Sequence, residues 1–319
     1  MVRLRLAFLG TPAFAAAALD RLLGSPHEVV GVVTQPDRPR GRGQRSSFSP
    51  VKALAAGAGL PVLQPERLKA PEFHEAFRAL NAELAVVAAY GRIIPDEVIA
   101  TPRLGMINIH ASILPEYRGA APIHRAVIAG EVETGVSIMR VVRELDAGPV
   151  FAVARRPIGT DETSIDVEQA LARAGADLCV EVIDAIAAGT AVETPQDHAR
   201  ATYAPRLTRE EGWLDWALPA IDLHNRVRGL QPWPLAQGVL AGQRLLFLRS
   251  AVARPPYRAR PGEVLAAGGD DFLVAAGDGA LRLVDVQPEG RRVMTAREFL
   301  AGRPVVPGAR FEPPLRTLP

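Results

Sequence analysis

The sequence predicts an α/β protein, with a Rossmann-like, mostly parallel sheet in an N-terminal domain and a small, OB-like β-barrel in a C-terminal domain. Three observations support this fold class. The 319 residues exceed the size of one ordinary compact domain. In the first half, nearly continuous apolar strands alternate with helices, a pattern typical of a parallel sheet covered on both faces. In the last third, short strands follow one another with glycine-rich turns between them.

The first half of the chain supplies the strands and helices of the parallel sheet. Strands are expected at residues 4–9, 29–34, 82–88 and 106–109, and helices at 13–23, 51–58, 71–80 and 122–129. Such sheets bind ligands beyond the carboxyl ends of their strands, so we expect the functional site there. The turn at Gly10-Thr11-Pro12 lacks the further glycines of a dinucleotide-binding motif, which argues against a nicotinamide or flavin cofactor.

The second half begins with the end of the first domain. Strands at 136–140 and 150–155 and a long helix at 164–188, ended by Gly189, complete a domain at residues 1–189. A polar segment with two prolines predicts a linker at 190–206. The barrel domain covers 207–319, with a helix at 219–229 and strands at 237–240, 244–250, 262–266, 272–275 and 281–286.

The composition excludes several classes of protein. A hydrophobic fraction of 48% and a charged fraction of 23% are typical of a globular protein. No apolar run reaches the ~20 residues that cross a bilayer, and the apolar start is too short for a signal peptide. We therefore expect a cytoplasmic protein without membrane contact. As a separate expectation, the protein acts as a monomer. Cys179 is the only cysteine and lies in an apolar run at helical spacing, so we expect a buried structural thiol and no metal site.

Three polar side chains form the candidate catalytic site. They begin in the segment GMINIHASILPEYRGAAPI, residues 105–123. Alternate side chains of a strand share a face, so Asn108 and His110 point the same way as Met106, whereas the isoleucines between them point into a core. Asp146 lies downstream in a predicted tight turn between two strands.

An amide, an imidazole and a carboxylate together suit attack on a carbonyl-type centre. The amide donates to the oxygen that gathers charge, the imidazole stabilises that oxygen or passes protons, and the carboxylate orients the imidazole. No serine or cysteine nucleophile stands beside a base, which favours direct transfer over a covalent enzyme intermediate. Each residue alone also fits a structural role, Asp146 above all as a turn residue.

Several motifs together resemble the folate-dependent formyltransferases. They are Asn108-x-His110, the loop 112–115, the run Arg118-Gly-Ala-Ala-Pro-Ile, the Asp146-Ala-Gly turn, the Gly10-Thr-Pro opening and Pro232-Trp-Pro. The resemblance spans nearly the whole chain and is strongest to family members that act on tRNA. Ile113, Glu116 and His124 depart from the residues that relatives usually carry at these positions.

The resemblance implies a reaction and roles for these residues. The amino group of methionyl-tRNA, the charged initiator tRNA, would attack the formyl carbon of 10-formyltetrahydrofolate. Asn108 and His110 would stabilise the tetrahedral oxyanion, and Asp146 would orient His110 and help to move a proton. Contacts with the folate are implied for Ser112, Ile113, Leu114 and Pro115.

A basic segment at residues 35–45 bears on the acceptor. It holds four arginines and one aspartate, whereas the arginine frequency of the chain predicts about one arginine. Its prolines and glycines exclude a stable helix or strand. Such a run is either a solvated loop or a basic finger that neutralises RNA phosphates. The resemblance favours the second and implies tRNA contacts for Arg38, Arg40, Arg42 and Arg45.

Three alternatives remain open from the sequence. A formyltransferase that acts on a nucleotide-linked amino sugar would share the triad without needing the arginines. A formyltetrahydrofolate hydrolase would also share it, and a dehydrogenase would need a much longer chain. A non-catalytic RNA-binding protein would use only the barrel and the basic loop. Residues 207–319 carry 15 basic and 12 acidic side chains, a net charge of +3 that is compatible with RNA, but the intact Asn-His-Asp set argues against this alternative.

Overall fold

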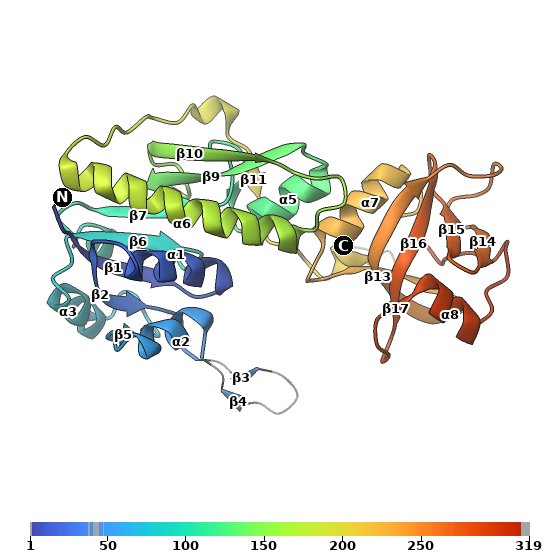
Figure 1. Cartoon of the computed structure of the whole chain (residues 1–319), viewed down its shortest axis with the longest axis horizontal. Helices are drawn as coiled ribbons and strands as arrows, with labels where there is room; N and C mark the ends of the chain where they lie inside the picture. Colours follow the sequence, from blue (N-terminus) through green and yellow to red (C-terminus); the bar gives the residue numbers. More distant parts are fainter. Residues whose placement is uncertain (1, 38, 41–44, 47, 314–319) are drawn as a thin grey trace. The chain divides into compact units, whose positions relative to one another are not determined.

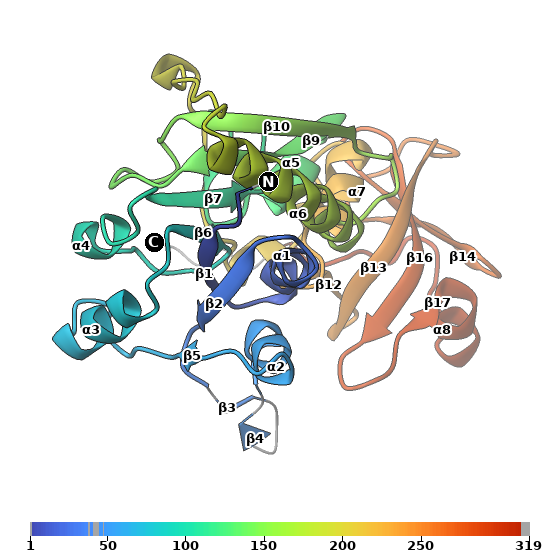
Figure 2. The ribbon, with the colours of Figure 1, turned by 60° about the vertical axis from the view of Figure 1, so that its left-hand side comes forward.

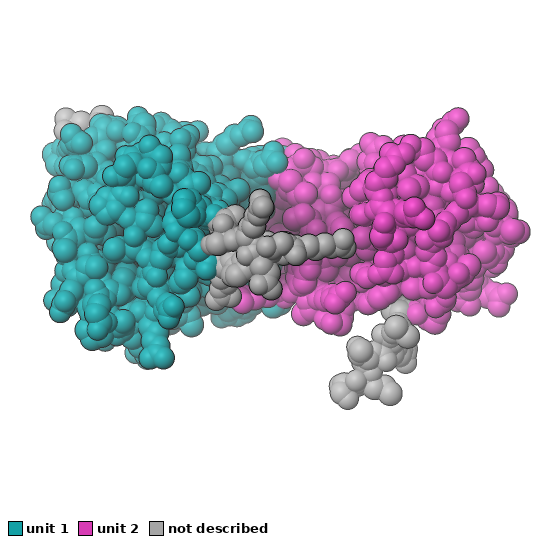
Figure 3. Space-filling model, turned by 90° about the horizontal axis from the view of Figure 1, so that it is seen from below, with its two compact units in different colours: residues 1–122, 133–156, 168–205 teal, residues 123–132, 157–167, 206–319 magenta. Residues whose placement is uncertain are grey.

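The computed structural model describes residues 2–37, 39–40, 45–46 and 48–313. The chain forms two compact units, which Figure 3 colours separately. The first comprises residues 1–122, 133–156 and 168–205, and the second comprises residues 123–132, 157–167 and 206–319. The predicted linker thus belongs almost entirely to the first unit, and two earlier segments belong to the second. The division into folding domains at 189 and 206 stays a prediction.

A seven-stranded sheet in the order β10-β9-β7-β6-β1-β2-β5 forms the centre of the first unit (Figure 1). Its strands are β1 (Arg5–Gly10), β2 (Glu28–Val33), β5 (Val62–Leu63), β6 (Leu84–Ala88), β7 (Met106–His110), β9 (Glu133–Arg140) and β10 (Val150–Pro157). The neighbouring strands β5, β2, β1, β6 and β7 run parallel to one another, and β9 runs antiparallel to β7. The predicted α/β fold with a mostly parallel sheet is therefore confirmed.

Helices cover both faces of this sheet. They are α1 (Ala13–Leu23), α2 (Pro50–Gly57), α3 (Pro71–Ala79), α4 (Asp96–Ile99) and α6 (Ser164–Ala188), whose first turn belongs to the second unit. Helices α1 and α6 lie on one face, and α3 and α4 lie on the other (Figure 2). Helix α2 begins at Pro50, where the Ser49 side chain accepts the Lys52 N–H and so satisfies a free backbone donor. Cys179 is fully buried on α6, as predicted.

Two pairs of short strands occur where no strand pattern is visible in the sequence. In the basic segment, β3 (Pro39–Arg40) and β4 (Arg45–Ser46) pair antiparallel. Prolines and glycines are expected to exclude a stable helix or strand there, and the structure adds only a pair with two residues on each side, because proline is tolerated at a strand edge. Similarly, β8 (Arg118–Gly119) pairs parallel with β11 (Tyr203–Ala204), which ties the predicted linker to the first unit.

The second unit contains an antiparallel sheet in the order β12-β13-β16-β15-β14, with β17 paired to β16. Its strands are β12 (Ala236–Leu240), β13 (Gln243–Ala253), β14 (Val264–Gly268), β15 (Asp271–Ala275), β16 (Ala280–Pro288) and β17 (Met294–Thr295). Its helices are α5 (Pro122–Ala129), α7 (Ala220–Gly229) and α8 (Ala296–Gly302), and short 3-10 helices lie at His198–Arg200 in the first unit and Glu210–Gly212 in the second.

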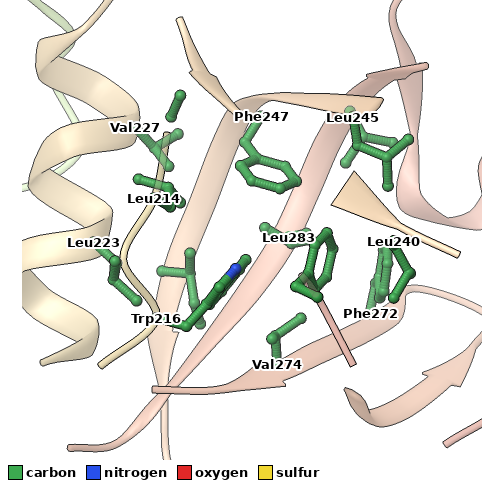
Figure 4. Close-up of a cluster of buried hydrophobic side chains, with 14 of the residues drawn as sticks. Leu214, Trp216, Leu223, Val227, Leu240, Leu245, Phe247, Phe272, Val274 and Leu283 are labelled. Carbon is green, nitrogen blue, oxygen red and sulfur yellow. The ribbon is translucent and has the colours of Figure 1, made fainter. Parts of the chain in front are cut away.

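Aliphatic side chains packed around a group of aromatic ones form the core of the second unit (Figure 4). The ring centroids of Trp216 and Phe311 lie 4.8 Å apart, and those of Phe247 and Phe311 lie 5.7 Å apart. The backbone at Phe311 bridges to Leu240 on β12, while the preceding Arg310 bridges to Glu263, which directly precedes β14. One segment therefore contacts strands at both edges of the sheet. Within the described ranges, no helix is both long and apolar enough to pass through a bilayer.

Candidate active site

Strand β7 places two of the predicted catalytic side chains. It lies inside the sheet, between the parallel β6 and the antiparallel β9, and Met106 at its start is fully buried. Towards the carboxyl end of the strand Asn108 becomes partly exposed. In the described part of the chain, the Asn108 amide has no hydrogen-bond partner. A donor on an otherwise buried strand is thus left free to meet a ligand.

The imidazole of His110 connects the strand to the predicted carboxylate. Its side chain is buried, with Nδ1 3.5 Å from Oδ2 of Asp146 and Nε2 3.0 Å from the carbonyl oxygen of Tyr117. The same Oδ2 accepts the N–H of Gly119 at 2.9 Å. A neutral imidazole can donate to one of its two oxygen neighbours, and a protonated one can donate to both. The structure therefore brings His110 and Asp146 together from segments that are 36 residues apart.

The turn that carries Asp146 has an unusual backbone. Asp146 adopts a φ of +49°, in the left-handed region that aspartate tolerates better than most residues. Two residues later, a Cβ on Gly148 would lie 2.0 Å from the carbonyl oxygen of Arg140, so only glycine fits there. The Asp146 side chain is 13% exposed, and its carboxylate is largely shielded from water.

The predicted folate-contacting loop is held from within. The Ser112 hydroxyl donates to the carbonyl of Glu116 at 2.6 Å, and Ser137 donates to the carbonyl of Ser112 at 2.7 Å. The Ser137 oxygen also accepts the N–H of Leu114 at 3.1 Å. Ser112 and Leu114 are buried, whereas Ile113 and Pro115 are partly exposed. Exposed side-chain surface for a ligand is therefore concentrated on Ile113 and Pro115.

The side chains of the four predicted tRNA-binding arginines lie outside the described part of the structure. Arg38 and Arg42 lie outside the described residues, and for Arg40 and Arg45 only the backbone of the β3–β4 pair is described.

The first residues of this segment are firmly anchored. Asp37 forms an ion pair with Lys52, and the hydrogen bond from Lys52 lowers the pKa of the Asp37 carboxyl. Gln64 donates to Asp37 at 3.1 Å and to the carbonyl of Gln35 at 2.9 Å. The Gln35 amide in turn donates to the carbonyl of Tyr90 at 2.7 Å. The basic segment thus starts from a fixed point on the first unit.

Comparison with protein families decides the class of chemistry. The model for formyl transferases matches residues 4–183, and the model for the formyl transferase C-terminal domain matches residues 206–304. The chain belongs to the formyl transferase family. It is 47% identical over 305 residues to the methionyl-tRNA formyltransferase of Moorella thermoacetica, covering 96% of this chain and 98% of that protein. It is also 47% identical over 313 residues to the methionyl-tRNA formyltransferase of Symbiobacterium thermophilum, covering 98% of this chain and 96% of that protein.

Solved structures show that this formyl transferase shares its fold with more distant proteins. HypX from Aquifex aeolicus, in complex with tetrahydrofolic acid, matches with a TM-score of 0.66 at 19% identity, over 93% of this chain and 47% of that chain. The sugar 3N-formyl transferase WlaRD matches with a TM-score of 0.66 at 16% identity, over 91% and 99%. At these identities the matches support a shared fold and do not indicate which molecule accepts the formyl group.

Some residues that support the site of this formyl transferase have a role that no sequence pattern predicts. Gln196, from the predicted linker, is buried and hydrogen-bonds the Asp146 turn, and Ser137 on β9 fixes the loop after β7. Arg118 and Gly119 belong to a motif that carries the family resemblance, but no sequence pattern predicts that Arg118 contacts Gln196 or that Gly119 contacts Asp146. Among the residues that the structure describes, no group of three or more His, Cys, Asp or Glu is arranged to hold a metal ion.

Proposed function

We propose that this formyl transferase moves the formyl group of 10-formyltetrahydrofolate onto the amino group of methionyl-tRNA, and so supports the initiation of protein synthesis in the cytoplasm. One observation carries the proposal: the 3.5 Å contact between His110 and Asp146 at the end of the strand that also presents Asn108. This set lies in a chain that aligns over nearly its whole length with relatives named methionyl-tRNA formyltransferase.

The chemistry is a direct transfer between two nitrogens. The amine nitrogen attacks the formyl carbon, the carbonyl oxygen becomes an oxyanion, and collapse of the tetrahedral intermediate breaks the bond to the folate nitrogen. The proton that the amine loses ends on that folate nitrogen, so atoms and charge balance. The Asn108 amide, free in the structure, donates to the oxyanion. His110 donates through Nε2 as the oxyanion forms, and shares or gives up its bond to Tyr117.

Asp146 serves this step by orientation and charge. Its Oδ2 faces Nδ1 of His110, which leaves Nε2 as the ring atom that can turn to the substrate. A carboxylate in this shielded place stabilises the imidazole when it carries positive charge. It also offers an acceptor for the proton that leaves the attacking amine.

The folate-type donor fits the loop after β7. The tetrahydrofolate complex of HypX supports a donor of this class. We place the donor against residues 112–115, with side-chain contacts from Ile113 and Pro115 and backbone contacts from Ser112 and Leu114. The internal hydrogen bonds of the loop keep it in one shape before the donor arrives, which lowers the entropy that binding costs.

The acceptor fits a basic segment. We assign Arg38, Arg40, Arg42 and Arg45 to phosphate contacts with the tRNA, because residues 35–45 hold four arginines and because phosphates dominate such affinity. We further propose that the sheet of the second unit closes as an OB-like barrel that holds the tRNA by shape and charge. The bridges from residues 310–311 to both edges of that sheet support closure. We expect the enzyme to act as a monomer.

A three-acceptor assay tests the proposal. The purified chain is mixed with 10-formyltetrahydrofolate labelled in its formyl carbon, and with charged initiator tRNA, a nucleotide-linked amino sugar, or buffer alone. We expect label on the methionyl-tRNA and background levels elsewhere, with uncharged tRNA as the control. Vigorous formylation of the amino sugar would overturn the acceptor. Release of free formate in buffer would indicate a hydrolase, and tRNA binding without any transfer would indicate a non-catalytic protein.

A further inference from the structure

Gln196 links the turn that carries Asp146 to the segment that carries Arg118. Its side-chain Nε2 donates to the carbonyl of Asp146 at 2.9 Å and to the carbonyl of Gly148 at 2.6 Å. Its Oε1 accepts two hydrogen bonds from the Arg118 guanidinium, at 3.2 Å from Nε and 2.6 Å from Nη2. The residue is only 9% exposed.

These partners require an amide. Two carbonyl oxygens need a donor, and a guanidinium, which has only donors, needs an acceptor. A glutamine side chain supplies both ends at once. A glutamate at position 196 has the same size and still accepts from Arg118, but it would turn an acceptor towards the carbonyls of Asp146 and Gly148. The four distances therefore fix which end of the amide faces which turn.

Arg118 stands between two backbone groups of the site. The carbonyl of the residue before it, Tyr117, faces His110, and the N–H of the residue after it, Gly119, donates to the Asp146 carboxylate. The Arg118 side chain is 4% exposed. Among the described ion pairs it has no carboxylate partner, so the Gln196 oxygen is its chief acceptor beside Nδ1 of His198. A buried cation held in this way is sensitive to the loss of that acceptor.

The turn at Asp146 needs external support. A non-glycine residue at φ +49° persists when the surroundings fix it, and relaxes when they do not. The Gln196 amide holds the backbone of this turn from one side, and Gly119 holds the carboxylate from the other. Rotation of the turn would lengthen the 3.5 Å approach of Asp146 to His110.

We propose that Gln196 is a positioning residue, which together with Arg118 sets the distance and direction of the Asp146 carboxylate relative to His110. The expected change in turnover rests on the proposed formyl transfer, whereas the expected change in the position of the Asp146 carboxylate relative to His110 does not. A shift of the carboxylate by about 1 Å costs about 10- to 100-fold in turnover when the reacting groups depend on it.

The test compares Gln196→Glu, Gln196→Ala and a control, Thr194→Ala, whose exposed side chain lies in the same segment. Formylation of methionyl-tRNA is measured as kcat and KM for both substrates. The His110 ring is followed by NMR of protein labelled with ¹⁵N-histidine, and thermal unfolding is recorded for each variant. We expect Gln196→Glu to lose 10- to 100-fold in kcat, with KM changed less than about threefold, and to shift the His110 Nδ1 signal.

The outcomes separate a positioning role from a purely structural one. The kcat of Gln196→Ala is expected to fall as that of Gln196→Glu does. Thr194→Ala is expected to match the parent protein in its kinetics, its His110 signal and its thermal unfolding. A Gln196→Glu protein with a lowered unfolding temperature but an unchanged kcat and His110 signal would overturn the proposal. If the parent itself fails to formylate methionyl-tRNA, the proposed function fails, and the His110 signal alone still decides whether Gln196 sets the geometry.

Discussion

Replacing Asp146 by asparagine removes a single charge from the site while keeping the size of the side chain. The structure gives the carboxylate two contacts, the Gly119 N–H at 2.9 Å and His110 Nδ1 at 3.5 Å. An asparagine oxygen still accepts a hydrogen bond from the Gly119 N–H, so this contact of the turn is kept. The interaction that changes is the one between the carboxylate and an imidazole that carries positive charge.

The size of the effect follows from the distance and the shielding. At 3.5 Å and an effective dielectric constant of about 20, Coulomb's law gives about 5 kcal/mol between a carboxylate and a protonated imidazole. If all of this acts in the transition state, the rate falls by about a few thousand-fold. The remaining dipole of the amide offsets a part, so we expect turnover to drop by about 10²- to 10³-fold.

Single-turnover formylation of charged initiator tRNA measures this drop, and filter binding measures the affinity for the same tRNA. The matched control is Glu144→Gln, which removes one negative charge two residues away at an exposed position. We expect Asp146→Asn to bind tRNA with nearly the parent affinity and Glu144→Gln to turn over at nearly the parent rate. An Asp146→Asn enzyme with more than a tenth of the parent rate would refute the role of its charge. A large loss of tRNA affinity would make the residue structural.

Three further predictions concern other parts of the molecule. Arg42→Ala should raise KM for the tRNA without changing folate affinity, and this increase in KM should shrink at high salt. The effect of the exposed control Arg67→Ala should not depend on salt in this way. An unchanged salt dependence for Arg42→Ala would contradict the phosphate contact. Burial raises the pKa of the Cys179 thiol to about 12, so the native protein should resist iodoacetamide at pH 8 and react once unfolded; rapid native labelling would contradict the burial. Phe247→Ala, which empties a fully buried aromatic site, should cost about 3–5 kcal/mol in denaturant unfolding of the second unit; a loss below about 1 kcal/mol would be incompatible with that core.

Elements with strong periodicity could be predicted from the sequence. The helix α6 follows an apolar pattern over 25 residues, and the structure begins and ends it as predicted. The strand β7 is apolar except for Asn108 at its centre and His110 at its end, and that interruption predicts the candidate site. Both signals are local, because they depend on which faces of one element are buried.

Features made by distant contacts could not be predicted in this way. The strands β8 and β11 have two residues each, too few for any alternation, and they exist because the chain segments meet. Gln196 lies in a polar, proline-containing stretch that reads as a linker, and its role depends on Asp146, 50 residues earlier. The left-handed backbone of Asp146 is likewise imposed by tertiary contacts and not by its own preference.

The most direct measurement is a crystal structure with a formyl-folate analogue that cannot transfer its formyl group. We predict that the formyl oxygen lies within about 3.2 Å of the Asn108 amide nitrogen and of a His110 ring nitrogen, with Asp146 still facing the other ring nitrogen. An analogue bound with its formyl group beyond hydrogen-bond reach of both Asn108 and His110 would contradict the proposed chemistry.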